Sequence, residues 1–223
     1  MDEKTLILLP AYECALALPG LIARIRMEAP FHTVLIVDDG SLDNTFEAAR
    51  KAGVFTLHHP ENRGKGAALS TGFQYARVNG FDAVITLDAD GQHDPSDLRA
   101  FFEADADLAA GCREFRRNVM PFWRICSNRL TSLLVRAVTG KRILDSQCGY
   151  RKVLLSALEG FVPRYQGYQF ETELLLHIAL RKEARIVNVP IKTLYSGEKS
   201  HIRHFRDIRQ FLVALGRALC HSR

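Results

Sequence analysis

The sequence lacks the signatures of several common classes of protein. Its five cysteines are widely spaced and form no Cys-x-x-Cys pair, which argues against a disulfide framework and a zinc knuckle. No apolar run reaches the roughly 18–20 residues that a membrane-spanning helix needs. The N-terminus shows no signal-peptide pattern. We therefore expect a cytoplasmic protein that can lie at the inner face of a membrane without crossing it.

Two common nucleotide-binding signatures are also absent. The first predicted strand is followed by residues 10–13 (PAYE), where a dinucleotide-binding fold would carry G-x-G-x-x-G. There is no P-loop either. Residues 61–66 are glycine-rich and include Lys65, and they precede a predicted helix whose N-terminus could attract phosphate. An ordinary loop is the alternative for this segment.

Acidic residues are scarce in the second half of the chain. Residues 1–112 hold 9 Lys+Arg and 17 Asp+Glu, a net charge of −8, whereas residues 113–223 hold 21 and 8, a net charge of +13. A strongly basic half suggests an anionic partner. Nucleic acid is not the expected one, because the aromatic residues are spaced for burial and not for an exposed stacking platform. The arginine-bordered amphipathic segments 119–138 and 203–220 fit attachment to an anionic membrane surface or, alternatively, ordinary core-covering helices.

Strand and helix patterns alternate along the chain. Strands are predicted at residues 5–9, 33–37, 54–57, 83–87, 108–112 and 185–193, the last near a sheet edge because of Pro190. Helices are predicted at residues 16–27, 43–51, 66–78, 95–103, 119–138 and 170–180. This order predicts an α/β fold with a mostly parallel sheet flanked by helices on both faces. Ligands of such folds bind beyond the carboxyl ends of the strands.

Two acids follow the fourth predicted strand. Asp88 and Asp90 are two residues apart, so in extended chain their side chains point to the same face. Neighbouring carboxylates repel unless a cation lies between them, and oxygen ligands suit Mg²⁺ or Mn²⁺. Gln92 could supply a third oxygen. The alternative is a solvated acidic turn in which Asp94 caps the next helix.

A second acidic turn follows the strand at residues 33–37. Asp39, beside Gly40, could accept hydrogen bonds from a base N–H or from ribose hydroxyls. The alternative is a turn with no ligand, followed by Asp43 as the N-cap of the next helix.

Four segments, taken together and in this order along the chain, indicate a known family: residues 10–13 (PAYE), 37–45 (VDDGSLDNT), 62–68 (NRGKGAA) and 88–92 (DADGQ). Over residues 5–195 the chain resembles the family-2 inverting glycosyltransferases with the GT-A fold. Within that family it is most similar to the dolichyl- and polyprenyl-phosphate sugar synthases. The resemblance implies a GT-A domain at 1–200, with a nucleotide-sugar half (1–112) and an acceptor half (113–200). A basic amphipathic helical extension would follow at 201–223.

The resemblance also implies a site for a UDP- or GDP-sugar. It assigns a divalent metal, Mg²⁺ or Mn²⁺, to Asp88, Asp90 and Gln92. It assigns the donor to Pro10, Tyr12, Glu13, Asp39, Gly40, Lys65, Asp88, Ala89, Arg113 and Arg151.

The acceptor that the resemblance implies is a lipid-linked phosphate. Such a phosphate is already an anion, so it needs arginines and no general base. The candidate arginines are Arg113, Arg117, Arg129 and Arg151. A hydroxyl acceptor would need a base, for which Asp145 is the first candidate and Glu171 the second. The residues predicted to act in catalysis are Asp145, Asp90 and Arg129.

Rival interpretations are a nucleotidyltransferase and a non-catalytic binding module. A nucleotidyltransferase would carry a glycine-rich, arginine-containing loop where residues 10–13 stand. The intact pair of Asp88 and Asp90 argues against a module without catalysis.

Overall fold

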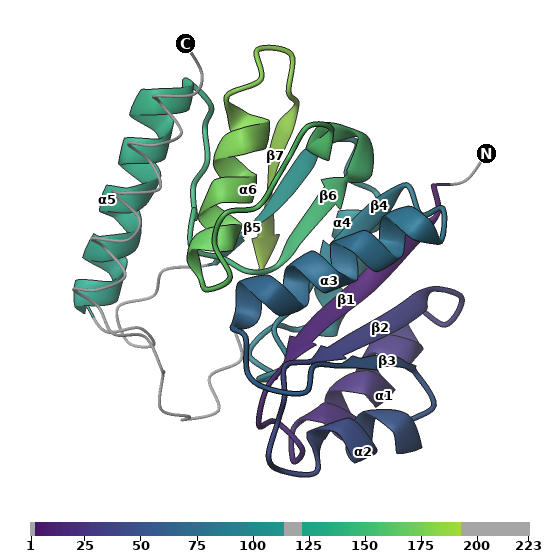
Figure 1. Cartoon of the computed structure of the whole chain (residues 1–223). Helices are drawn as coiled ribbons and strands as arrows, with labels where there is room; N and C mark the ends of the chain where they lie inside the picture. Colours follow the sequence, from purple (N-terminus) through teal and green to yellow (C-terminus); the bar gives the residue numbers. More distant parts are fainter. Residues whose placement is uncertain (1–2, 114–121, 193–223) are drawn as a thin grey trace.

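The computed structural model describes residues 3–113 and 122–192 (Figure 1). The predictions for Arg117 and for the basic extension at 201–223 lie outside these residues. So do parts of the predicted acceptor half, residues 114–121 and 193–200.

Within the described residues, seven strands form one sheet in the order β3-β2-β1-β4-β6-β5-β7. They are β1 (Thr5–Ala11), β2 (Thr33–Asp38), β3 (Phe55–His58), β4 (Ala83–Thr86), β5 (Leu108–Arg113), β6 (Arg151–Leu154) and β7 (Ile186–Ile191). Every neighbouring pair is parallel except β6 with β4 and β6 with β5. The mostly parallel sheet and the edge position of β7 are confirmed, whereas β6 was not predicted.

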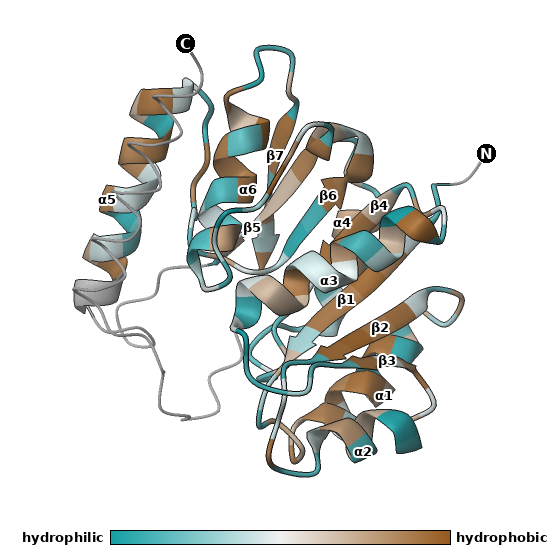
Figure 2. Ribbon diagram, in the orientation of Figure 1, coloured by the Kyte–Doolittle hydropathy of each residue, from teal (hydrophilic) through white to brown (hydrophobic). Residues whose placement is uncertain are grey.

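Helices cover both faces of this sheet. They are α1 (Leu18–Glu28), α2 (Thr45–Lys51), α3 (Lys65–Val78), α4 (Leu98–Phe102), α5 (Phe122–Thr139) and α6 (Gln169–Ala179). Successive side chains of β1 alternate between two cores, as the two-residue period of a strand requires. Leu6 and Leu8 pack with α3 and α6, and Ile7 and Leu9 pack with α1 and α4. The strands β1, β2 and β4 are accordingly apolar along most of their length (Figure 2).

Most predicted boundaries differ from the structure by one to three residues, and two of these differences have a clear physical reason. The first strand does not stop before Pro10 but runs through Ala11. Pro10 is tolerated because the pairing of β1 with β4 ends at Leu8, so Pro10 pairs only with β2. The helix predicted at 95–103 begins as a 3₁₀ turn, Pro95–Asp97, and continues as α4. Asp94 caps it as expected, since its side chain accepts the Ser96 N–H at 3.0 Å.

Because of the antiparallel strand β6, the strands on either side of it run in the same direction. Because β6 is antiparallel to both β4 and β5, these two strands are parallel to each other. The carboxyl ends of β1, β2, β4 and β5 therefore share one edge with the start of β6. We call this the carboxyl edge. Among the described helices, none is long and apolar enough to span a bilayer.

Candidate active site at the carboxyl edge

The turn after β2 is organised by Asp39. Its Oδ1 atom lies 2.7 Å from His59 Nδ1 and accepts the Arg63 N–H at 3.1 Å, and its Oδ2 atom accepts the Gly64 N–H at 2.6 Å. Asp39 is only 2% exposed, so its carboxylate shapes the loop that leads into α3. At Gly40, where φ is +71°, a Cβ atom would lie 2.3 Å from the backbone of Glu61. Only glycine fits there.

The turn after β1 is tied to the turn after β2. The Glu13 N–H donates to Ser41 Oγ, and the Cys14 N–H donates to Thr45 Oγ1, both at 2.9 Å. Tyr12 is 43% exposed beside these turns. The structure therefore places Tyr12 and Glu13 next to the Asp39–Gly40 turn.

Lys65, the first residue of α3, joins two carboxylates. Its Nζ atom lies 2.6 Å from Asp88 Oδ1 and 3.0 Å from Glu171 Oε2. Glu171 is in the first turn of α6. Burial disfavours the charged form of Lys65, but the two carboxylates outweigh it and raise the pKa of the ammonium. Burial would likewise raise the pKa of Asp88, but Lys65 lowers that pKa to about 2. Lys65 and Asp88 are therefore both charged at neutral pH.

The segment after β4 holds the two acids of the predicted metal site. Asp90 Oδ1 accepts the Gln92 N–H at 3.0 Å, and the Asp88 N–H donates to His93 Nδ1 at 3.3 Å. Burial lowers the pKa of His93 to about 4, so its neutral imidazole can accept this bond. Ala89 is buried between the acids.

The donor chemistry of this segment fits Mg²⁺ or Mn²⁺. Asp88, Asp90 and Gln92 offer two carboxylates and one amide oxygen, and Mg²⁺ is usually held by one or two carboxylates plus phosphate and water. In the described part of the chain, no three His, Cys, Asp or Glu side chains gather as a metal site.

Asp145 is fully buried and bound on several sides. Arg113 donates to it through Nε at 2.7 Å and Nη2 at 3.0 Å, and Asn128 Nδ2 donates at 2.7 Å. Burial alone would raise the pKa of this carboxyl, but the bonds from Arg113 lower it. The geometry makes Asp145 an anchor that orients Arg113. Its role as general base stays a prediction.

The other two predicted arginines lie in different surroundings. Arg151 is 3% exposed, and it donates to the carbonyl oxygens of Ser146 and Cys148 at 2.8 Å and of Glu171 at 2.7 Å. Its guanidinium thus holds backbone in place. Arg129 lies on the exposed face of α5, one residue from the buried Asn128. The structure brings Arg113, Asp145 and Asn128 together but does not bring Arg129 into this cluster.

Gly149 lies in the segment 145–151, which the resemblance places in the sugar and acceptor site, but no role of its own was predicted for it. A Cβ atom on it would lie 2.9 Å from Asp88 Oδ2 and 3.1 Å from Glu171 Oε1. Thr86 Oγ1 donates to the Gly149 carbonyl at 2.7 Å. The backbone before β6 therefore packs against both carboxylates that hold Lys65. Only knowledge of β6 and its pairing with β4 could have revealed this approach.

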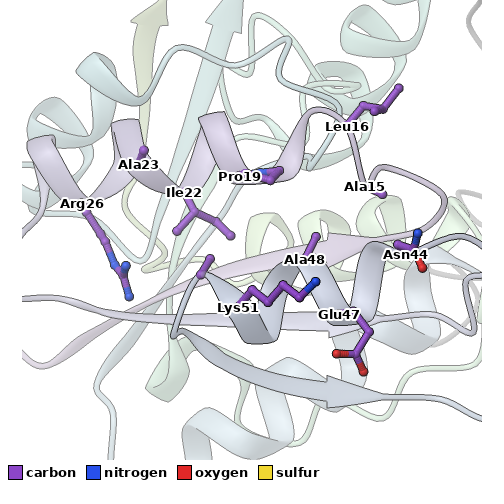
Figure 3. Close-up of a pocket in the computed structure, with 11 residues that line it drawn as sticks. Ala15, Leu16, Pro19, Ile22, Ala23, Arg26, Asn44, Glu47, Ala48 and Lys51 are labelled. Atoms are coloured by element: carbon purple, nitrogen blue, oxygen red, sulfur yellow. The ribbon is translucent and has the colours of Figure 1, made fainter.

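A groove of about 700 Å³ lies between α1 and α2 (Figure 3). Small and apolar side chains, such as Pro19, Ile22 and Ala48, make up most of its lining, with Arg26 and Lys51 among the charged ones. None of the predicted site residues lines it. The chemistry of the carboxyl edge is thus separate from this groove.

The fold matches that of glucosyl-3-phosphoglycerate synthase from Mycobacterium tuberculosis. The structure of that protein with Mn²⁺, uridine diphosphate and phosphoglyceric acid superposes with a TM-score of 0.75, at 19% identity over 97% of this chain and 78% of that chain. Another structure of it, with Mg²⁺ and uridine diphosphate, gives a TM-score of 0.73. The protein is therefore of the GT-A fold class, as the sequence predicted.

The family follows from the sequence comparison. The model described as "Glycosyl transferase family 2" matches residues 6–158, and the chain belongs to this family of glycosyltransferases. An undecaprenyl-phosphate mannosyltransferase from Micrococcus luteus is 32% identical over 84% of this chain and 82% of its own length. A polyprenol monophosphomannose synthase from Mycolicibacterium smegmatis is 30% identical over 85% and 77%. A UDP-N-acetylglucosamine–dolichyl-phosphate N-acetylglucosaminyltransferase from Methanococcus voltae is 28% identical over 87% of both chains.

Proposed function

We propose that this glycosyltransferase moves a sugar from a UDP- or GDP-sugar to a lipid-linked phosphate of the polyprenyl or dolichyl type, with inversion. The names of the relatives support the acceptor, since all three contain a lipid phosphate or a polyprenol. The observation that carries the proposal is the Lys65–Asp88 pair, 2.6 Å apart at the carboxyl edge. The Lys65 ammonium and the Asp88 carboxylate thus lie together beside the turns that follow β1 and β2.

The donor would lie along these turns. Pro10, Tyr12, Glu13 and Gly40 would border the nucleotide, with Asp39 and Ala89 keeping the adjoining loops in shape. Asp88, Asp90 and Gln92 would hold Mg²⁺ or Mn²⁺, which when bound stabilises the negative charge that develops on the leaving diphosphate. The Lys65 ammonium supports the same charge from the start of α3.

The acceptor phosphate needs no deprotonation. One of its oxygens attacks the anomeric carbon on the face opposite the diphosphate, and the carbon–oxygen bond to the diphosphate breaks as the new bond forms. The Arg113 guanidinium, oriented by Asp145, would bind this acceptor phosphate. A hydroxyl acceptor remains the second candidate, with Glu171 or Asp145 as the base.

The protein would bind its lipid-linked acceptor at a membrane surface. We propose peripheral attachment to an anionic inner leaflet, from the cytoplasmic side. The exposed face of α5 supports this proposal because Leu130 and Leu133, 49% and 61% exposed, lie between the exposed Arg129 and Arg136. The division into a nucleotide-sugar half at 1–112 and an acceptor half at 113–200 stays a prediction.

The test is a transfer assay with a panel of UDP- and GDP-sugars, each with Mg²⁺ or Mn²⁺, with and without polyprenyl phosphate. We expect a lipid-linked product from one donor only when polyprenyl phosphate is present. Asp90→Asn should lower the transfer rate by about 100-fold. Asp105→Asn, a matched change at a surface acid that is 84% exposed, should leave it unchanged. Full activity of Asp90→Asn, or no turnover with any donor, would refute the proposal.

A further inference from the structure

The ammonium of Lys65 is shared between carboxylates from two different parts of the fold. Asp88 follows β4, and Glu171 belongs to the first turn of α6, 106 positions beyond Lys65 in the chain. The three side chains are 17–29% exposed. The transfer of the sugar to a phosphate, as proposed above, gives Glu171 no part of its own.

Asp88 has two incompatible tasks in this arrangement. It is a proposed ligand of a divalent cation, yet Lys65 Nζ lies 2.6 Å from its Oδ1 atom. An ammonium and a divalent cation on one carboxylate repel each other. A divalent cation can therefore bind both oxygens of Asp88 only after the Lys65 ammonium has moved away from this carboxylate.

Glu171 can hold the Lys65 ammonium after it has left Asp88. Its Oε2 atom already lies 3.0 Å from the ammonium, so Lys65 can leave Asp88 without losing all its ion pairs. Asp88 and Glu171 both lie close to Gly149, since a Cβ atom on this residue would be 2.9 Å from Asp88 Oδ2 and 3.1 Å from Glu171 Oε1. Of the three side chains, that of Lys65 is the longest and most flexible, so it is the one that we expect to move.

We propose that Lys65 blocks Asp88 in the donor-free protein and that Glu171 retains the ammonium when Asp88 turns to a divalent cation. Glu171 is then a positioning residue that acts through Lys65. This inference rests on the metal site of the proposed function. It makes the affinity for the metal alone low, because Lys65 must be displaced before the cation binds.

The test is a double-mutant cycle on Mn²⁺ binding without nucleotide, followed by the electron paramagnetic resonance signal of free Mn²⁺. Lys65→Met should tighten Mn²⁺ binding by about tenfold, and Glu171→Gln should weaken it by about fivefold. In the Lys65→Met background, Glu171→Gln should change the affinity by less than about twofold, because no ammonium is left to retain. Circular dichroism would check folding, and Lys65→Gln would replace Lys65→Met if the latter does not fold.

The control for the loss of one positive charge is Arg63→Met, in the exposed loop before α3. It should change the Mn²⁺ affinity by less than about twofold. The inference is overturned if Lys65→Met leaves the affinity unchanged, or if Glu171→Gln has the same effect in both backgrounds. If Asp88→Asn also fails to weaken Mn²⁺ binding, the metal site of the proposed function falls with it. If Asp88→Asn abolishes binding, the metal site stands and only the role of Lys65 and Glu171 is lost.

Discussion

Replacing Asp145 by asparagine tests whether this residue anchors Arg113 or removes a proton. The carboxylate accepts bonds from Arg113, Asn128 and the Gln147 backbone, and it is fully buried. An asparagine keeps one oxygen and turns an NH₂ group toward these donors. Breaking a buried ion pair from one side costs about 3–5 kcal/mol.

The exposure of Arg113 places the expected cost near the lower limit. The Arg113 side chain is 21% exposed, so water can solvate part of its positive charge once the Asp145 carboxylate has been removed. We expect Asp145→Asn to lower the free energy of unfolding by about 3 kcal/mol, measured by urea denaturation. Asp105→Asn, at the surface, should change it by less than about 0.5 kcal/mol.

The kinetic result separates the two roles of Asp145. An anchor that orients Arg113 predicts a higher KM for polyprenyl phosphate with a smaller change in kcat. A general base predicts a fall in kcat of about 10²–10⁴-fold with a hydroxyl acceptor. Unchanged stability, or a collapse of kcat at constant KM, would refute the anchoring role.

Two further predictions concern pH and the membrane. Burial lowers the pKa of His93 to about 4 in the folded protein, whereas the unfolded value is about 6.5. The unfolded chain therefore binds the proton first, and stability should fall by up to about 3 kcal/mol as the pH drops from 6.5 to 4. The urea midpoint, measured as a function of pH, should show this loss. His93→Gln, which keeps an acceptor for the Asp88 N–H, should make the midpoint depend less on pH. An equal pH dependence in both proteins would contradict the prediction. On α5, the double change Leu130→Glu and Leu133→Glu should reduce co-sedimentation with anionic liposomes by about tenfold. Val162→Glu, at another exposed apolar residue, should not, and equal binding of all three proteins would count against membrane contact through α5.

Much of the fold was predictable because its strands follow simple rules. β1, β2, β4 and β5 are short apolar runs between helices, which is the pattern of a buried parallel strand. The strand β6 escaped prediction because its sequence is RKVL. Its Arg151 and Lys152 are nevertheless 3% and 2% exposed. Lys152 is accommodated by the Ala104 carbonyl at 2.9 Å and by Glu3 at 2.8 Å, partners that no local pattern reveals.

The candidate site was predictable to the extent that it depends on local spacing. The position of Asp88 beyond the carboxyl end of a strand followed from the apolar run of β4 alone, whereas the shared direction of Asp88 and Asp90 stays a prediction. The bond of Lys65 to Glu171 and the contact of Gly149 with Asp88 join positions far apart in the chain. Such contacts follow from the order of strands in the sheet, which the sequence pattern of single elements does not contain.

The place of β6 in the sheet has a consequence for how the protein folds. β4 and β5 are consecutive strands in the chain, yet they are separated in the sheet by β6, which begins 38 residues after the end of β5 (from Arg113 to Arg151). If β4 and β5 pair with each other before residues 151–154 are available, that pairing has to break before β6 can take its place between them. Non-local closure of this kind slows folding, so the second half of the sheet is expected to form late, after β1, β2 and β3 have assembled.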